Sequence, residues 1–174
     1  MNKKIDNCTP AGSRMIAQLR AVHRPLRADV KALRDALREL ANAAIGPEAL
    51  QRTIAGLTVA QLGWQLSTRC QYFCETLSVH HMIEDARMLP SMLRHFPKLR
   101  PTIEHLQRDH KDVHRQLKTI MRAADTMDAG APDTVRKLAN AMAMLADHLE
   151  THLDFEEKSL FPYFARMNVD WHHG

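Results

Sequence analysis

Four long stretches of the sequence carry apolar residues spaced three and four apart, and a histidine interrupts each of these stripes. Such spacing places the residues on one face of an α-helix. Glycines and prolines at residues 46–56, 97–101 and 128–132 separate the stretches. Four amphipathic helices with short connections predict an all-α protein, an up-down-up-down four-helix bundle whose core is built from the four stripes.

The four stripes consist of the following residues. The first is Ile16, Leu19, His23, Leu26, Val30, Leu33, Leu37, Leu40 and Ala44, and the second is Leu66, Cys70, Phe73, Leu77, His80 and Glu84. The third is Ile103, Leu106, His110, Val113, Leu117, Ile120 and Ala124, and the fourth is Val135, Leu138, Met142, Leu145, Leu149, His152 and Glu156. In two stripes a glutamate follows the histidine by four residues, which is one helical turn.

The composition agrees with a helical protein of one domain. Leu and Ala number 42 against 14 for Val and Ile, and unbranched side chains lose less rotamer freedom in a helix. We expect a flexible N-terminus at residues 1–12, the bundle at 13–167 and a C-terminal tail at 168–174. Residues 47–56 are expected to form a longer connection or a short extra helix.

Charge and hydropathy narrow the possible partners. The net charge is +4, but Lys and Arg are interspersed with acidic residues, so we expect no nucleic-acid partner. Neither an export signal nor a membrane-spanning stretch is evident, which predicts a cytoplasmic protein.

The cysteines Cys8, Cys70 and Cys74 are expected to be reduced, structural thiols. Redox sensing by Cys70 and Cys74 is the alternative.

The polar residues of the stripes should lie at one level of the bundle. Counting residues from each turn places the four stripe histidines and the two glutamates in a common layer near one end. Unsatisfied buried polar groups cost about 1–3 kcal/mol each, so something must compensate them. A pair of metal ions would do so, because a histidine and a glutamate four residues apart can converge on one centre. An ion-free hydrogen-bond network is the alternative.

The types of ligand narrow the choice of metal. Mixed imidazole and carboxylate donors suit iron, manganese or zinc, and the absence of thiolate argues against a structural zinc site. We expect iron, with manganese or zinc less favoured.

The order of these residues along the chain resembles that of a known family. His23, then His80-His81-Met82-Ile83-Glu84-Asp85, then Asp109-His110, then His152-Leu153-Asp154-Phe155-Glu156-Glu157 look like the haemerythrin-like HHE cation-binding domain. The resemblance implies a four-helix bundle around a non-haem di-iron centre with an oxo or hydroxo bridge. It also implies that His23, His80, His110 and His152 are terminal ligands and that Glu84 and Glu156 bridge the ions.

The chain departs from the oxygen-carrying haemerythrins in its outer residues. Those proteins have a His-x-x-x-His pair on the third helix and an aspartate five residues after the last histidine. Here His114 follows His110 by four residues, and Glu157 stands five after His152. His114 lies one step off its stripe, so whether His114, His81 or His148 adds a ligand is left open. His95 and His105 are expected at the surface.

The resemblance implies a protein that binds or senses O2 or NO at the di-iron centre. Three alternatives remain open: an enzyme that consumes peroxide or NO, a store or donor of iron, and an interaction bundle without functional metal. The small ligands are O2, NO or peroxide, a redox partner is possible, and the oligomeric state is left open.

Overall fold

Helices account for nearly all of the chain that the computed structural model describes, which is residues 8–42, 59–128 and 131–168. The elements are α1 (Pro10–Asn42), α3 (Val59–Ile83), the π-helical turn η1 (Glu84–Met88), α4 (Leu89–His95), the 3-10 turn η2 (Pro97–Leu99), α5 (Arg100–Asp125) and α6 (Pro132–Phe164). These residues include no strand, so the predicted all-α class is confirmed. The prediction for residues 47–56 lies outside the described residues.

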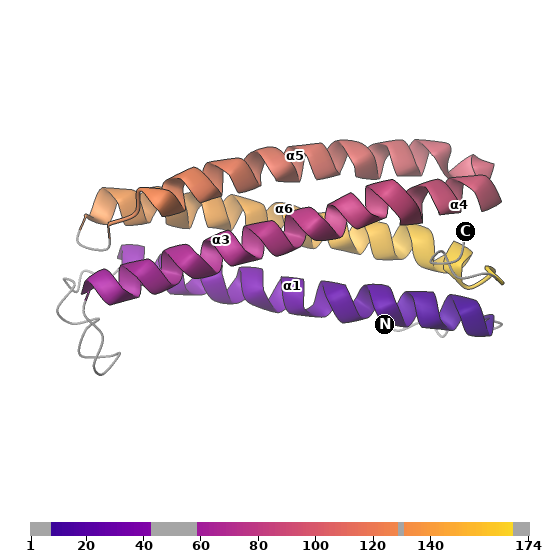
Figure 1. Cartoon of the computed structure of the whole chain (residues 1–174), viewed down its shortest axis with the longest axis horizontal. Helices are drawn as coiled ribbons and strands as arrows, with labels where there is room; N and C mark the ends of the chain where they lie inside the picture. Colours follow the sequence, from indigo (N-terminus) through magenta and orange to yellow (C-terminus); the bar gives the residue numbers. More distant parts are fainter. Residues whose placement is uncertain (1–7, 43–58, 129–130, 169–174) are drawn as a thin grey trace.

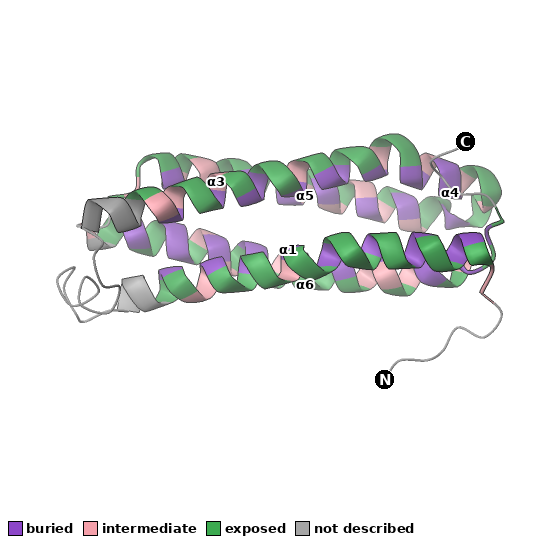
Figure 2. Cartoon of the chain, turned by 60° about the horizontal axis from the view of Figure 1, so that its bottom comes forward, coloured by how far each residue is buried: buried purple, intermediate pink, exposed green. Residues whose placement is uncertain are grey.

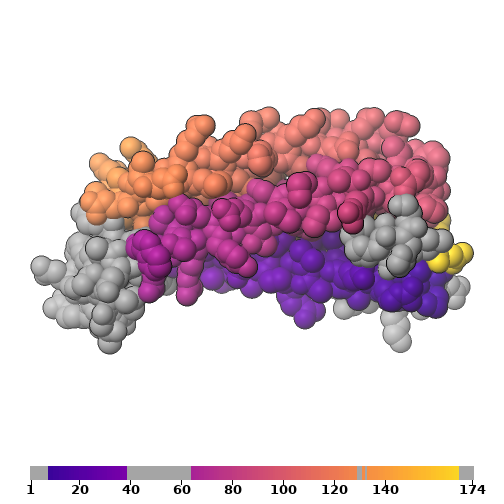
Figure 3. Space-filling model, viewed as in Figure 1, coloured from indigo at the N-terminus to yellow at the C-terminus, as the bar shows by residue number. Residues whose placement is uncertain are grey.

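The long helices pack side by side into a bundle (Figure 1). α1 contacts α3 and α6, and α5 contacts the same two helices. Figure 3 shows α3 running between α1 and α5 on the viewed face. All stripe residues with described side chains are buried, and the buried faces turn toward the middle of the bundle (Figure 2). The predicted core is thereby confirmed, except at Leu40 and Ala44, whose side chains are outside the described set.

Two apolar clusters fill the bundle, one on each side of the polar layer. The larger cluster includes Leu37, Leu117 and Leu145, and the smaller includes Met15, Leu106 and Phe164. The polar layer therefore lies inside the bundle, between the two clusters. The predicted position near one end differs from this. The smaller cluster contains stripe residues such as Leu106, and α4 and the first turns of α1 add residues outside the stripes, such as Met92 and Met15.

The prolines are accommodated in two different ways. Pro25 and Pro162 lie inside α1 and α6, which continue past them. Pro90 instead follows the π-helical turn η1, in which the Leu89 N–H donates to the Glu84 carbonyl five residues before it. π-helical turns are rare and frequently occur at functional sites, and this one begins at a predicted ligand.

The cysteines of α3 belong to the larger apolar cluster. Cys70 and Cys74 have no exposed surface, and all three cysteines, including the partly buried Cys8, are free. Burial raises the pKa of both α3 thiols to about 12. Because the reactive form is the thiolate, these features favour a packing role and argue against redox sensing.

The beginning of α1 is tied to the end of α6. Thr9 donates its backbone N–H to the Ala165 carbonyl at 2.9 Å and its hydroxyl to the Met167 carbonyl. The same hydroxyl accepts the Gly12 N–H at 2.9 Å, which caps the helix. Since α1 begins at Pro10, the predicted domain boundary at residue 13 falls inside the helix.

Gly12 leaves no room for a side chain, so we expect Gly12→Ala to destabilise the protein. A Cβ atom there would lie 2.2 Å from the Phe164 carbonyl oxygen. This oxygen belongs to the backbone of α6, which cannot move away as the end of a flexible side chain can. Alanine normally stabilises a helix relative to glycine, but overpacking should lower the free energy of unfolding by about 2–3 kcal/mol. Urea unfolding measures the change, with exposed Ser13→Ala as the control. Equal or greater stability of Gly12→Ala would contradict this close approach.

Candidate metal centre

Seven polar side chains meet between the two apolar clusters. They are His23 from α1, His80 and His81 from α3, Glu84 at the start of η1, His110 from α5, and His152 and Glu156 from α6. None of them is more than 8% exposed. The structure thus brings together all six residues that the sequence predicted as ligands and adds His81.

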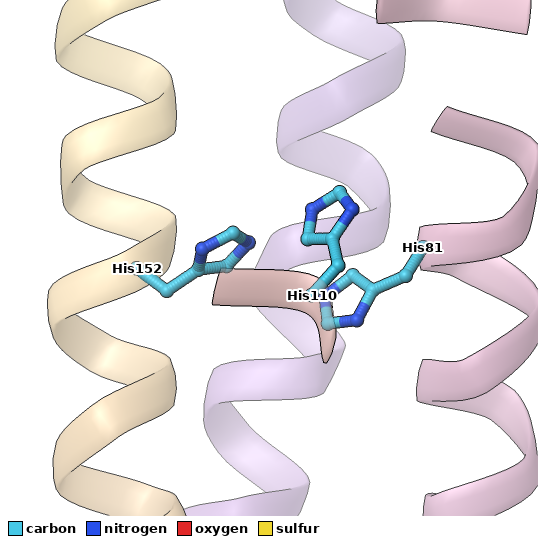
Figure 4. A group of neighbouring side chains, drawn as sticks. All are labelled: His81, His110 and His152. Atoms are coloured by element: carbon cyan, nitrogen blue, oxygen red, sulfur yellow. The ribbon is translucent and has the colours of Figure 1, made fainter. Parts of the chain in front are cut away.

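The seven side chains form two groups. In the pair group, His23, His80, Glu84 and Glu156 place one donor atom each within 4.8 Å of the others. In the triad, His81, His110 and His152 do the same, and Figure 4 shows these three rings turned toward one another.

Glu84 lies between the two groups. One carboxylate oxygen, Oε1, is 3.2 Å from His80 Nε2 and 4.0 Å from His23 Nε2. The other oxygen, Oε2, is 3.6 Å from His110 Nε2. A carboxylate that presents one oxygen to each group is arranged to bridge two ions.

The donor atoms at the centre are buried without hydrogen-bond partners. This holds for both oxygens of Glu84 and Glu156 and for the Nε2 atoms of all five histidines. Although some of these atoms approach one another, as His23 Nε2 and Glu156 Oε2 do at 3.4 Å, no hydrogen bond forms. Nine unsatisfied polar atoms at one point would be costly for any fold, whereas metal ions would satisfy all of them. The residues therefore fit a metal centre.

The outer nitrogens of three histidines are held by carboxylates. His23 Nδ1 is 2.9 Å from Glu157 Oε1, His110 Nδ1 is 3.0 Å from Asp85 Oδ1, and His152 Nδ1 is 3.3 Å from Asp109 Oδ2. A carboxylate there accepts a hydrogen bond from the Nδ1–H group, so the proton stays on Nδ1 and the lone pair is on Nε2, which points inward. Histidine ligands of metals are typically oriented in this way.

The charges at the centre suit metal binding. Burial lowers the pKa of His80 to about 3 and also lowers the pKa values of His81 and His152, so these imidazoles are neutral and free to coordinate. Burial raises the pKa of Glu84, and neighbouring Glu156 adds to this rise. Burial alone would lower the pKa of His23, but the carboxylates of Glu156, Glu157 and Glu84 raise it to about 11. A bound cation would take the place of that proton.

The remaining histidines lie outside the centre. His114 and His95 are exposed, and His105 is half-buried at the surface, where it packs edge-on against Phe155. His148 is partly buried, with Nδ1 3.3 Å from Gln116 Oε1. The expectation of a surface position for His95 and His105 is confirmed, and neither His114 nor His148 joins the donor groups.

From the sequence, His81 was left open as an additional ligand, and Asp85 and Asp109 were given no role. His81 is one residue off its stripe, and the two aspartates are exposed enough to look like ordinary surface residues. One signal could have identified the carboxylates. Asp85, Asp109 and Glu157 each stand next to a predicted ligand in the chain. From that position each carboxylate contacts the outer nitrogen of a histidine on a neighbouring helix.

Comparison with known families agrees with this geometry. The family model of the hemerythrin HHE cation-binding domain matches residues 14–164. The chain belongs to this family. The HHE match covers all seven side chains of the centre, so the buried donor groups lie in a cation-binding domain.

Two further comparisons found no relatives. A search of curated proteins and a search of solved structures each found no significant match. Among the described helices of this HHE domain, none combines the length and the apolar character that crossing a membrane requires.

Proposed function

We propose that this protein is a cytoplasmic, non-haem di-iron protein that binds or senses a small diatomic molecule, O2 or NO. The observation that carries the proposal is the set of nine buried donor atoms without hydrogen-bond partners, divided between two groups that Glu84 joins. Mixed imidazole and carboxylate donors without thiolate favour iron. The course of the chain in Figure 1 supports an up-down-up-down arrangement like that of haemerythrin.

The residues have separate tasks in this proposal. His23 and His80 would hold one ion, and His110 and His152 would hold the other, while Glu84 and Glu156 would bridge the two. Asp85, Asp109 and Glu157 keep protons on the outer nitrogens of their histidines, so that the inner nitrogens stay available. The apolar clusters on either side exclude bulk water from the layer.

The centre has the features that small-molecule binding needs. When bound, a pair of ferrous ions supplies open coordination positions and electrons for a small oxidising ligand. The protein fixes the spacing of the donors and keeps the imidazoles neutral. An open cleft of about 730 Å³ between α3 and α5 includes His81 and His110 in its lining.

The experiment begins with the iron content of protein purified without added metal, followed by anaerobic loading with ferrous iron. We expect about two iron ions per chain, as in the di-iron bundles, and a reversible absorbance change with O2 or NO. Catalytic removal of excess peroxide or NO would replace this proposal with the enzyme alternative. Ready loss of iron to a weak chelator would favour a store or donor. Failure to take up iron at all would refute the di-iron centre.

A further inference from the structure

We propose that His81 is a fifth imidazole ligand, so that one ion is held by three histidines and the other by two. This inference rests on the proposed di-iron function and refines it. In the haemerythrin pattern the extra histidine stands on the third helix, where this chain has His114. Here His114 is exposed, and the adjacent helix α3 supplies a buried histidine in its place.

The position of His81 points to coordination. Its side chain is 5% exposed, and its Nε2 atom is buried without a hydrogen-bond partner. One ring nitrogen of His81 lies within 4.8 Å of a ring nitrogen of His110 and of one of His152. The His81 and His110 rings are nearly parallel, with centroids 4.1 Å apart and planes at 8°, so one of them must rotate for both in-plane lone pairs to meet one ion. A histidine that only filled space would turn this nitrogen toward a polar partner or water, because an unsatisfied buried group is costly.

The consequence is an unequal distribution of nitrogen donors. The pair group has His23 and His80, the triad has His81, His110 and His152, and Glu84 presents an oxygen to each side. The ion of the pair group therefore keeps more positions that the protein does not fill.

His81 also stands where the cleft meets the centre. The cleft between α3 and α5 is lined by His81 and His110 at its inner side and includes Lys111, His114 and Arg115. With His81 in place, a molecule entering the cleft meets an ion whose positions are already taken by the protein. Replacing His81 by alanine would open that ion to molecules from the cleft.

The test uses the full chain loaded anaerobically with ferrous iron and counts coordinated imidazoles by proton NMR. Each coordinated ring gives an N–H signal shifted far outside the normal range by the paramagnetic ion. We expect five such signals in the native chain, four in His81→Ala and five in the cleft control His114→Ala. Four signals in the native chain, or a signal lost from His114→Ala instead, would overturn the inference.

A second readout is rescue by free imidazole. Iron affinity in His81→Ala should fall at least as much as after loss of an outer hydrogen-bond partner, about 10- to 100-fold, and added imidazole should restore it. Added imidazole should not change the iron affinity of the native chain. A loss that imidazole does not restore would mean that His81 acts only through packing.

The native count decides the question even if His81→Ala does not fold. It also separates this inference from the proposed function. Two bound irons with four shifted signals would refute the role of His81 alone, whereas a native chain without two irons would refute the di-iron proposal itself.

Discussion

Adding ferrous iron to the metal-free protein should raise its free energy of unfolding by about 4 kcal/mol when free iron exceeds the dissociation constant about 1,000-fold. The reason is that iron binds the folded chain, where nine donor atoms are buried without partners. An unfolded chain has no preformed site. Urea unfolding under anaerobic conditions, with and without iron, measures the difference.

The control for this prediction is the double variant Glu84→Gln/Glu156→Gln. It removes both carboxylates of the centre but changes the volume of the side chains very little. Iron should leave its unfolding curve nearly unchanged. If iron failed to stabilise the native chain, or stabilised the double variant equally, something other than iron would have to satisfy the nine buried donor atoms.

The sequence predicted the core more completely than the surroundings of the site. In α5, the seven stripe residues from Ile103 to Ala124 are the seven residues found buried. Helical periodicity was sufficient because each of the long helices keeps one face toward the bundle interior. The stripe histidines and glutamates followed from the same periodicity, since they occupy core positions.

Periodicity left the role of His81 open. This residue lies beside the stripe, and periodicity cannot show how far a helix is rotated about its own axis in the assembled bundle. α3 is turned so that both His80 and His81 face inward, and the π-helical turn that begins at Glu84 changes the phase of the helix after that point. Both features depend on packing among helices rather than on local sequence.

The neighbouring acids Glu156 and Glu157 differ in how far the sequence could place them. Glu156 lies on its stripe and was predicted at the centre, whereas the spacing did not show what Glu157 would contact. In the structure Glu156 is fully buried at the centre, while Glu157 holds His23 from outside and is itself 3.5 Å from Arg27 Nη2. Arg27 also pairs with Asp154 at 2.7 Å. The positively charged guanidinium thereby helps to keep Glu157 on the outer side.

Glu84→Gln is expected to reduce the iron content from about two ions per chain, the number in di-iron bundles, to one or fewer. Each oxygen of Glu84 faces a different histidine group. An amide carries no charge and offers only one donor oxygen, so it cannot bridge both groups. Iron analysis after gel filtration through metal-free buffer measures the loss.

Two matched variants show whether the bridging position is what matters. Glu157→Gln changes an acid that touches His23 from outside, so it should keep both irons and bind them about 10- to 100-fold more weakly. Exposed Glu104→Gln should change neither stoichiometry nor affinity. If Glu84→Gln retained two tightly bound irons, Glu84 would not be a bridge, and the ions would have to be joined through Glu156 alone. The contrast between Glu84 and Glu157 therefore tests the assignment of inner and outer carboxylates, on which the proposed division between the two ions depends.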